Sequence, residues 1–565
     1  MKKKVASLFF IAFCLAFQYG AVAQTGNAMR MLEMQQYNKA KAAFLINLKT
    51  SNSANNWFFL GKVYSIQNNI DSARICFNNI APADPKSNLS PVGMAILENM
   101  AGNKAEALLS LDKIQKSAVS AKDIVSLIEI AEARFSAGDT VKCFDILTSA
   151  SGFDKKNPRP FISAGKMYSK LGENYLQVSF NGLASGRFEQ ALYCDPENSE
   201  AKTNLANILV RARNYSDAEI ILNEVLAKDT VYIPALKLLG ELEYNNLGKF
   251  VIASEVYGKY MRLAEYSPKD QDLYIYILYF NKEYAKTNSL ISKVLKNDPS
   301  NPVMLRLKGY TSFELKNYSE GLTAMNSFFA LRSGKDTSKI SATDYEYYGK
   351  LLCESGSDSI GIIYLKKSIE LDSTKTGLYE TIALAYDKLK MNLVAVDYYE
   401  KFVASGNPGV SLMTYFNIGR DMYFMANAVK GTADSIQKPS YLVRADSAFS
   451  KVVANKPSSQ LGYLWRARVL YEMDPLTEQG LAKDDYQKTL EILEQKNDNQ
   501  RYKNDLLEAY LYMGYYYFLK YDAAKNAKDE AAKIQAKTDS LLYWQKVIEL
   551  DPTNEKAKQA LSALK

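Results

Sequence analysis

A repeated spacing of small and large apolar residues constrains this chain more than its composition does, and residues 54–87 carry the clearest copy. With Ala54 counted as position 1, small residues stand at positions 8 and 20 and a proline stands at position 32. The residues that define this copy are Trp57, Leu60, Gly61, Tyr64, Ala73, Phe77 and Pro85. Small residues at two such positions let two antiparallel helices approach closely, and proline ends the second helix. The spacing therefore predicts a helix–turn–helix unit.

The same spacing recurs, in weaker form, along nearly the whole chain. Later copies are marked by Ala206, Ala218, Gly240, Gly309, Gly321, Gly349, Gly361, Ala383 and Ala395. Asp-Pro pairs at 84–85, 195–196, 298–299 and 551–552 fall where second helices should end. Units that follow one another in this way stack and bury a continuous core, so the chain should form a solenoid.

The residues of these copies resemble the tetratricopeptide repeat (TPR). The resemblance is nearly complete at 54–87, good over 199–402 and weak at 88–157. It implies an all-α fold, a TPR superhelical solenoid of antiparallel helix pairs with about 13 units. The polar helix expected over 553–565 would close the stack.

Four units depart from the regular spacing, among them the unit that begins at Ala467, which is interrupted around Asp474-Pro475. One is about seven residues too long near 172–183, and the second helix after Gly419 is displaced by about fourteen. The last unit is interrupted by a Lys/Ala/Asp-rich stretch at 521–538. We expect N-terminal units over 24–157, central units over 158–410 and C-terminal units over 411–565. One continuous superhelix is the first expectation, and a break near 172–186 or 406–409 is the second.

The first 23 residues resemble a secretory signal peptide. A basic start (residues 2–4) precedes an apolar run (5–17), and Ala21-Val22-Ala23 forms a small-residue cleavage signal. Cleavage after Ala23 would leave Gln24 first. A lipoprotein signal is the alternative, because Cys14 lies nearby, but Phe13 stands where a small residue is required. We expect an exported protein, periplasmic or associated with the outer membrane, with no membrane-spanning segment in the mature chain.

Charge and residue types argue against several classes of function. The formal net charge is +8, and loss of the three leader lysines leaves +5, so no nucleic-acid partner is expected. The chain has no histidine, which removes the commonest general base and zinc ligand. No phosphate-binding loop, nucleophile elbow or dinucleotide fingerprint is present. We therefore expect no enzyme, no catalytic residue, no metal site and no cofactor.

The expected function lies on the concave groove, which in TPR proteins is lined mainly by the first helix of each unit. Aromatic and arginine residues at groove positions are the candidate partner-binding residues, because these types anchor protein interfaces. They are Tyr244, Tyr276, Tyr279, Phe280, Arg306, Tyr310, Phe313, Phe416, Arg420, Tyr423, Arg468 and Tyr471. The alternative is that they pack between neighbouring units, since the chain has 40 tyrosines. Asn204 and Asn207 do not make a carboxylate clamp, because later units lack the paired Lys and Arg.

The leading hypothesis is a non-enzymatic exported TPR scaffold that binds a protein or peptide partner of a cell-envelope assembly, secretion or transport complex. The composition is similar to that of exported TPR proteins of Bacteroidetes-type bacteria. The alternative is a glycan- or nutrient-binding helical protein of the outer membrane, although such proteins normally carry a lipidated cysteine. Self-association is a third hypothesis.

Overall fold

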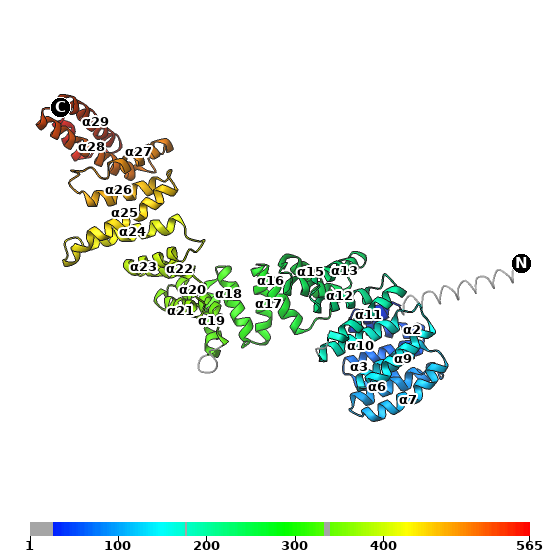
Figure 1. Ribbon diagram of the computed structural model, residues 1–565. Helices are drawn as coiled ribbons and strands as arrows, with labels where there is room; N and C mark the ends of the chain where they lie inside the picture. Colours follow the sequence, from blue (N-terminus) through cyan, green and yellow to red (C-terminus); the bar gives the residue numbers. More distant parts are fainter. Residues whose placement is uncertain (1–25, 176–177, 333–338) are drawn as a thin grey trace, which may run out of the picture. The chain divides into compact units, whose positions relative to one another are not determined.

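The computed structural model describes residues 26–175, 178–332 and 339–565, and no β-strand occurs within these ranges. The chain separates into two compact units, Met1–Thr287 and Asn288–Lys565, which are described one at a time. In each unit, antiparallel helix pairs follow one another along the chain (Figure 1). This arrangement confirms the predicted all-α TPR solenoid.

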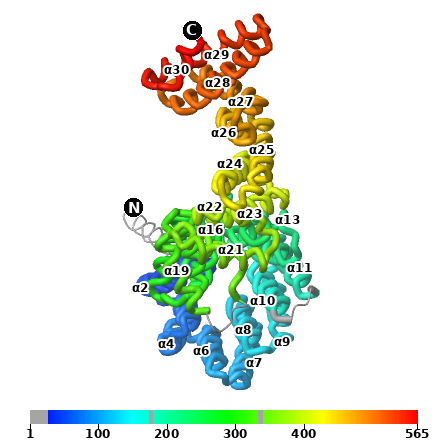
Figure 2. The backbone as a smooth tube through the Cα atoms, turned by 90° about the vertical axis from the view of Figure 1, so that its left-hand side faces the viewer, coloured from blue at the N-terminus to red at the C-terminus, as the bar shows by residue number. Residues whose placement is uncertain are grey.

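Unit 1 starts with helical residues 26–33, which we call the N-terminal helix. The helices that follow are α2 (Tyr37–Thr50), α3 (Ala54–Ile66), α4 (Ile70–Asn78), α5 (Ile80–Ala83), α6 (Leu89–Met100), α7 (Lys104–Ser120), α8 (Ile124–Ala137), α9 (Thr140–Phe153), α10 (Arg159–Tyr175), α11 (Val178–Cys194), α12 (Ser199–Arg211), α13 (Tyr215–Lys228), α14 (Ile233–Asn245), α15 (Phe250–Leu263) and α16 (Pro268–Phe280). Figure 2 shows α7, α8, α9 and α10 side by side.

The boundary between the units falls within α17 (Tyr284–Asn297). Unit 2 continues with α18 (Pro302–Glu314), α19 (Tyr318–Arg332), α20 (Ala342–Glu354), α21 (Asp358–Leu371), α22 (Leu378–Lys388), α23 (Asn392–Ala404), α24 (Leu412–Ala428), the 3-10 helix η2 (Ala433–Gln437), α25 (Lys438–Asn455), α26 (Gln460–Met473), α27 (Lys483–Lys496), α28 (Lys503–Ala527), α29 (Glu530–Leu550) and α30 (Glu555–Ala563). The polar helix expected over 553–565 is α30. The boundaries expected at 157 and 410 remain predictions.

One side chain, Phe77, shows how neighbouring helix pairs are held together. Phe77 lies on α4 and is completely buried. A Cβ added at Gly61 of α3 would lie 2.5 Å from its ring, and one at Gly93 of α6 would lie 2.3 Å from it. The ring therefore fills the space of two missing side chains, one in its own helix pair and one in the next. This contact brings three helices together at a distance that only glycine allows.

The same contact recurs along both units, between a glycine of a first helix and a large residue of the second helix. The pairs are Gly165–Phe188, Gly240–Tyr257, Gly309–Met325, Gly349–Leu365, Gly419–Phe449 and Gly514–Trp544. In each pair an added Cβ would lie less than 3.0 Å from the partner side chain. The repeat spacing seen in the sequence is therefore the spacing of this contact.

The predicted insertions lengthen helices and leave this contact in place. The separation is sixteen residues from Gly61 to Phe77, twenty-three from Gly165 to Phe188 and thirty from Gly419 to Phe449. The helices of the longer units have grown: α10 and α11 have 17 residues each, against 13 in α12 and 14 in α13. One added turn is about 3.6 residues, so seven residues divided between two helices return the contact to the same face. The stretch at 521–538 likewise extends α28 and α29.

Replacing Gly93 by alanine should test this packing. The added methyl group has no room beside the buried Phe77 ring, so unit 1 should lose about 1–3 kcal/mol of stability through overpacking. The matched control is Gly152→Ala in α9, where nothing lies within 4 Å of the added Cβ. That variant should be neutral or gain up to about 1 kcal/mol from helix propensity. Urea unfolding followed by circular dichroism measures both, and equal midpoints would contradict the close approach.

Candidate functional site

The structure brings three of the predicted residues of unit 1 into one aromatic cluster. Phe280 of α16 lies 5.8 Å from Tyr244 of α14 and 5.4 Å from Tyr279, measured between ring centroids. Phe250, which was not among the predicted residues, stacks on Phe280 at 5.5 Å. Phe280 remains 47% exposed. Tyr276 is half-buried on the same helix. The cluster is a partly exposed apolar surface at the end of unit 1.

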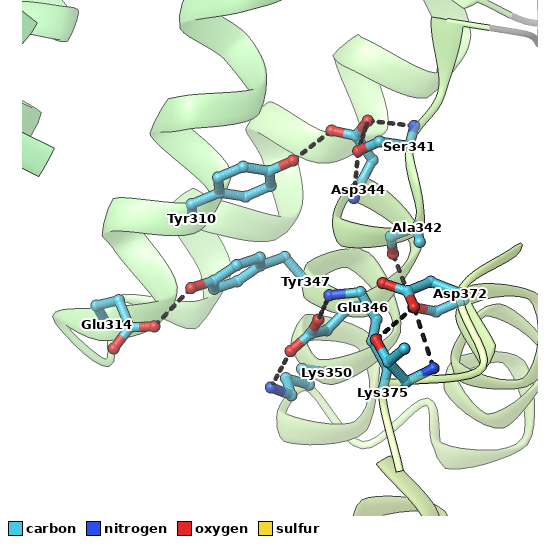
Figure 3. Close-up of polar contacts among 12 residues, drawn as sticks. Tyr310, Glu314, Ser341, Ala342, Asp344, Glu346, Tyr347, Lys350, Asp372 and Lys375 are labelled. Atoms are coloured by element: carbon cyan, nitrogen blue, oxygen red, sulfur yellow. Dashed lines mark hydrogen bonds and ion pairs between the residues drawn. The ribbon is translucent and has the colours of Figure 1, made fainter. Parts of the chain in front are cut away.

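Arg306 and Tyr310 of α18 both contact one buried carboxylate, that of Asp344 in α20. The Arg306 guanidinium donates to Asp344 Oδ2 at 2.9 Å, and the Tyr310 hydroxyl donates to Asp344 Oδ1. Asp344 also completes the capping box that starts α20, since it accepts hydrogen bonds from the backbone N–H and the hydroxyl of Ser341. Figure 3 shows Tyr310 pointing at this carboxylate. Both predicted residues therefore hold α18 to α20.

Phe313 is held in a similar way. Its ring lies 5.6 Å from that of Tyr347, which stacks on Tyr310 at 4.3 Å. The Tyr347 hydroxyl donates to Glu314 Oε1 at 2.8 Å, as Figure 3 shows. Beside it, Lys350 and Lys375 both contact the Glu346 carboxylate at 2.6 Å. The contacts of the residues at 306–313 are thus contacts between neighbouring repeats.

An aromatic cluster of unit 2 surrounds Trp465 of α26. Four rings lie 5.7–6.1 Å from the Trp465 ring, and the Arg468 guanidinium lies over it at 4.9 Å. The four rings are those of Phe416, Tyr423, Phe424 and Phe449. Trp465 and Phe424 were missed in the sequence analysis. The signal that could have found Trp465 is its rarity, since the chain has three tryptophans, and its place on the first helix that carries Arg468.

We call the first-helix part of this cluster, together with Tyr471 of the same helix α26, the Trp465 surface; it consists of Phe416, Tyr423, Phe424, Trp465, Arg468 and Tyr471. Phe424 is 44% exposed and Tyr471 is 40% exposed. Arg468 is oriented by two hydrogen bonds to the Glu508 carboxylate of α28, at 2.8 Å and 2.7 Å. Exposed aromatic rings beside an oriented arginine can bury large apolar area and supply directional hydrogen bonds at little cost in side-chain entropy.

Arg420, the remaining predicted residue, lies beside the Trp465 surface between two carboxylates. Its Nη2 donates to Asp387 Oδ2 at 2.8 Å, and its Nε donates to Asp421 Oδ1 at 2.9 Å. The Tyr399 hydroxyl also donates to Asp387 Oδ2. These three charged groups and Phe424 line a pocket of about 510 Å³. Burial, with a contribution from the Asp387 carboxylate, raises the pKa of Asp421 to about 7 against the lowering effect of Arg420.

The four cysteines that the structure describes lie at separate packing positions. Cys76, Cys143 and Cys353 are buried and Cys194 is half-buried, and all four are free thiols. Burial raises the pKa of Cys76 and of Cys353 to about 11, which makes the reactive thiolate scarce at neutral pH. Among the residues that the structure describes, no group of three or more acidic or thiol side chains is arranged to hold a metal ion. No helix in the same ranges is both long and apolar enough to cross a membrane.

Comparisons with known proteins find one matching family model and solved structures of limited similarity. Residues 183–242 match the family model described as Tetratricopeptide repeat. No curated protein matches the chain. Among solved structures, the C-terminal part of a TPR repeat-containing protein from Cytophaga hutchinsonii is 28% identical, covering 51% of this chain and 98% of its own, with a TM-score of 0.37.

Two further solved structures are more distant. A tetratricopeptide repeat protein from Parabacteroides merdae is 16% identical, with 46% of this chain and 98% of that chain covered and a TM-score of 0.28. PilF from Pseudomonas aeruginosa is 19% identical, with 39% and 95% covered and a TM-score of 0.30.

Tyr310→Phe should show that the residues at 306–313 stabilise the fold. The substitution removes a donor from the completely buried Asp344 carboxylate, so unit 2 should lose about 1–3 kcal/mol of stability. In the matched control, Tyr347→Phe, the lost hydrogen bond goes to the exposed Glu314, and the loss should be less than about 1 kcal/mol. Urea unfolding of both variants is the measurement, and equal losses would contradict a structural role for the Asp344 contact.

The Asp421 carboxyl should make the stability of unit 2 depend on pH. The unfolded carboxyl has a pKa of about 3.9, whereas the folded pKa is about 7. Below the unfolded pKa the Asp421 carboxyl is protonated in both the folded and the unfolded state. The stability that its protonated form gives the folded state is then fully present. Between the two pKa values only the folded state keeps the proton, so the free energy of unfolding should fall as pH rises from about 4 to about 7.

Asp421→Asn should flatten this dependence, because the amide does not titrate. The exposed Asp397→Asn serves as the control and should leave it in place. Thermal unfolding of the three proteins between pH 5 and pH 8 compares them. A wild-type free energy of unfolding that rises from pH 5 to pH 8, with the rise absent in Asp421→Asn, would contradict the raised pKa of Asp421.

Proposed function

Because the chain contains tetratricopeptide repeats, we propose that it is a non-enzymatic scaffold that binds a segment of a partner protein on the Trp465 surface. The observation that carries the proposal is the exposure of Phe424 and Tyr471 beside an oriented Arg468, within unit 2. Tyrosine and arginine are enriched among the residues that dominate binding energy at protein interfaces, and phenylalanine is enriched at interfaces as well.

The contacts inside the Trp465 surface support a protein segment over a sugar. A sugar ring binds by stacking flat on an open aromatic face, but Phe416, Tyr423 and Phe424 meet Trp465 edge to face, and Arg468 covers it. The exposed edges instead form a rigid apolar floor with a charged neighbour, which suits apolar side chains of a peptide or helix.

We further propose that this scaffold works in the cell envelope, because residues 1–23 resemble a secretory signal peptide. A basic start, an apolar run and Ala21-Val22-Ala23 are the marks of a secretory signal, so the scaffold works in the periplasm or at the outer membrane. The partner belongs to an assembly, secretion or transport complex of that compartment. N-terminal sequencing of the protein purified from the native envelope tests this placement: Gln24 as the first residue supports export, and a retained Met1 in the cytoplasmic fraction contradicts it.

Replacing the two exposed rings tests the binding surface. We expect Phe424→Ser with Tyr471→Ser to weaken partner binding at least ten-fold, since loss of two anchoring rings removes more than about 1.4 kcal/mol. The control is Tyr193→Ser, which removes a 90% exposed ring of unit 1. Crosslinking pull-down from the native envelope, with wild type and both variants side by side, is the measurement.

The expected outcome is one protein recovered by wild type and by Tyr193→Ser and lost from the double variant. Equal recovery by all three would remove the Trp465 surface from the proposal. Binding of a soluble oligosaccharide that depends on Phe424 and Tyr471 would instead favour the glycan-binding class.

A further inference from the structure

The N-terminal helix and the start of α2 contact residues far along unit 1. The Tyr232 hydroxyl donates to the Glu33 carboxylate at 2.7 Å, and the Arg30 guanidinium pairs with Asp229 at 2.5 Å. The Gln36 amide donates to the Leu263 carbonyl, and Asn38 donates twice to the Glu265 carboxylate, at 2.8 Å and 2.9 Å. The partners are 199 to 227 residues apart in sequence. We call these the closure contacts, because they join the first helix pair to the end of α13, α14 and α15.

The closure contacts differ in kind from the contacts between successive repeats. Successive repeats are joined by completely buried rings such as Phe77 against Gly61 and Gly93. The closure contacts are hydrogen bonds and an ion pair; Arg30, Glu33, Asn38 and Glu265 are exposed, whereas Tyr232 and Gln36 are buried. The exposed contacts of Arg30 and Asn38 contribute little to stability, because water replaces them readily. The part-buried hydrogen bonds of Tyr232 and Gln36 cost more to break. Opening the closure breaks these polar contacts and can leave each helix pair folded.

The closure covers two pockets on the first-helix side of unit 1. One, of about 570 Å³, lies between the N-terminal helix and α3, α8, α10 and α12; Met29, Leu32 and Glu33 form part of its wall. The other, of about 310 Å³, lies between Met34 and Gln35 on one side and α12 and α14 on the other. We call the two together the covered chamber. Volumes of this size suit small molecules.

A chain of charged residues crosses the larger pocket. Lys62 of α3 contacts the Glu129 and Glu132 carboxylates of α8 at 2.6 Å and 2.7 Å. Glu132 accepts a hydrogen bond from Ser163 of α10, and Lys166 pairs with Glu200 of α12. In the smaller pocket the buried Thr203 hydroxyl has no hydrogen-bond partner. Alternating charges and a spare hydroxyl along successive first helices match an extended segment that carries both acidic and basic side chains.

We propose that the first helix pair is a movable cover, and that breaking the closure contacts exposes the chamber to a partner segment of mixed charge. The proposal rests on the proposed function only for the class of partner, a protein. It concerns a surface of unit 1, separate from the Trp465 surface of unit 2. The cover would make binding in unit 1 conditional, because a partner has to compete with the chain's own first helix pair.

Opening is tested without any partner, by the reactivity of a cysteine placed inside the chamber. Ser163→Cys puts a thiol on the wall of the larger pocket, where Ser163 is 5% exposed. Cys14→Ser and Cys194→Ser remove the leader cysteine and the one described cysteine that is not buried. The probe is a maleimide carried on a polyethylene glycol chain, which is too large for the closed chamber.

The closure is weakened by Asp229→Asn, Tyr232→Phe and Glu265→Gln together. We expect the labelling rate to rise at least ten-fold, with helix content and the urea midpoint unchanged. The matched control is Glu197→Gln, which breaks an exposed ion pair with Lys228 elsewhere in unit 1 and should leave the rate unchanged. An equal rate in the weakened and unweakened proteins overturns the movable cover. A faster rate together with lost hydrogen-exchange protection throughout α2 and α3 also overturns it, since the unit has then unfolded.

The occupant is tested with two fluorescent twelve-residue peptides, one of alternating Lys and Glu and one of Ser and Gly. Both are titrated into proteins that carry Phe424→Ser and Tyr471→Ser, so that the Trp465 surface does not contribute. We expect the charged peptide to bind the weakened-closure protein at least ten-fold more tightly than the closed protein, and Lys62→Met with Lys166→Met to abolish the gain. Equal binding of the two peptides overturns the assignment of a mixed-charge segment, whatever the outcome at the Trp465 surface.

Discussion

Close approach of a first-helix glycine to a large buried side chain is the contact on which the whole architecture depends. Phe77 fills the space beside both Gly61 and Gly93, so one ring joins its own helix pair to the next. Because interiors are packed as densely as organic crystals, this contact admits little variation, and it recurs with Phe188, Tyr257 and Trp544 in longer and shorter units. Insertions are accepted where they lengthen two helices by whole turns, since the same faces then meet again.

Polar contacts are added to this apolar framework and join the same neighbours. Asp270 and Asp344 each cap a first helix and also accept a hydrogen bond from a cationic residue of the preceding first helix, Lys237 or Arg306. Side chains of the first helices therefore either hold neighbouring repeats together or stay exposed to a partner. Residue type alone does not distinguish these two roles. Arg306 and Tyr310 are occupied by Asp344, whereas Phe424 and Tyr471 keep much of their surface in water. The exposed side chains of the first helices are therefore the better candidates for partner binding.

The repeat, the helix ends at Asp-Pro pairs and the places of the long units could all be predicted from the sequence, because each depends on spacing within one or two helix pairs. The positions of the candidate residues on first helices could also be predicted. Their surroundings could not: Trp465 was missed, since nothing local indicates that four rings gather around it. The closure contacts escaped prediction for a related reason, because Tyr232 and Glu33 are 199 residues apart.

The sequence by itself determined the kind of protein this is. Small residues at two positions of each unit and a large residue at a third are enough to specify helix pairs that stack, because those contacts are made between near neighbours in the chain. Only the tertiary structure decided which first-helix side chains are buried and which remain exposed. It also decided that the first helix pair of unit 1 contacts α14 and α15 through residues at 229–265. These outcomes depend on small rotations that accumulate from one repeat to the next, and no single unit of sequence encodes their sum.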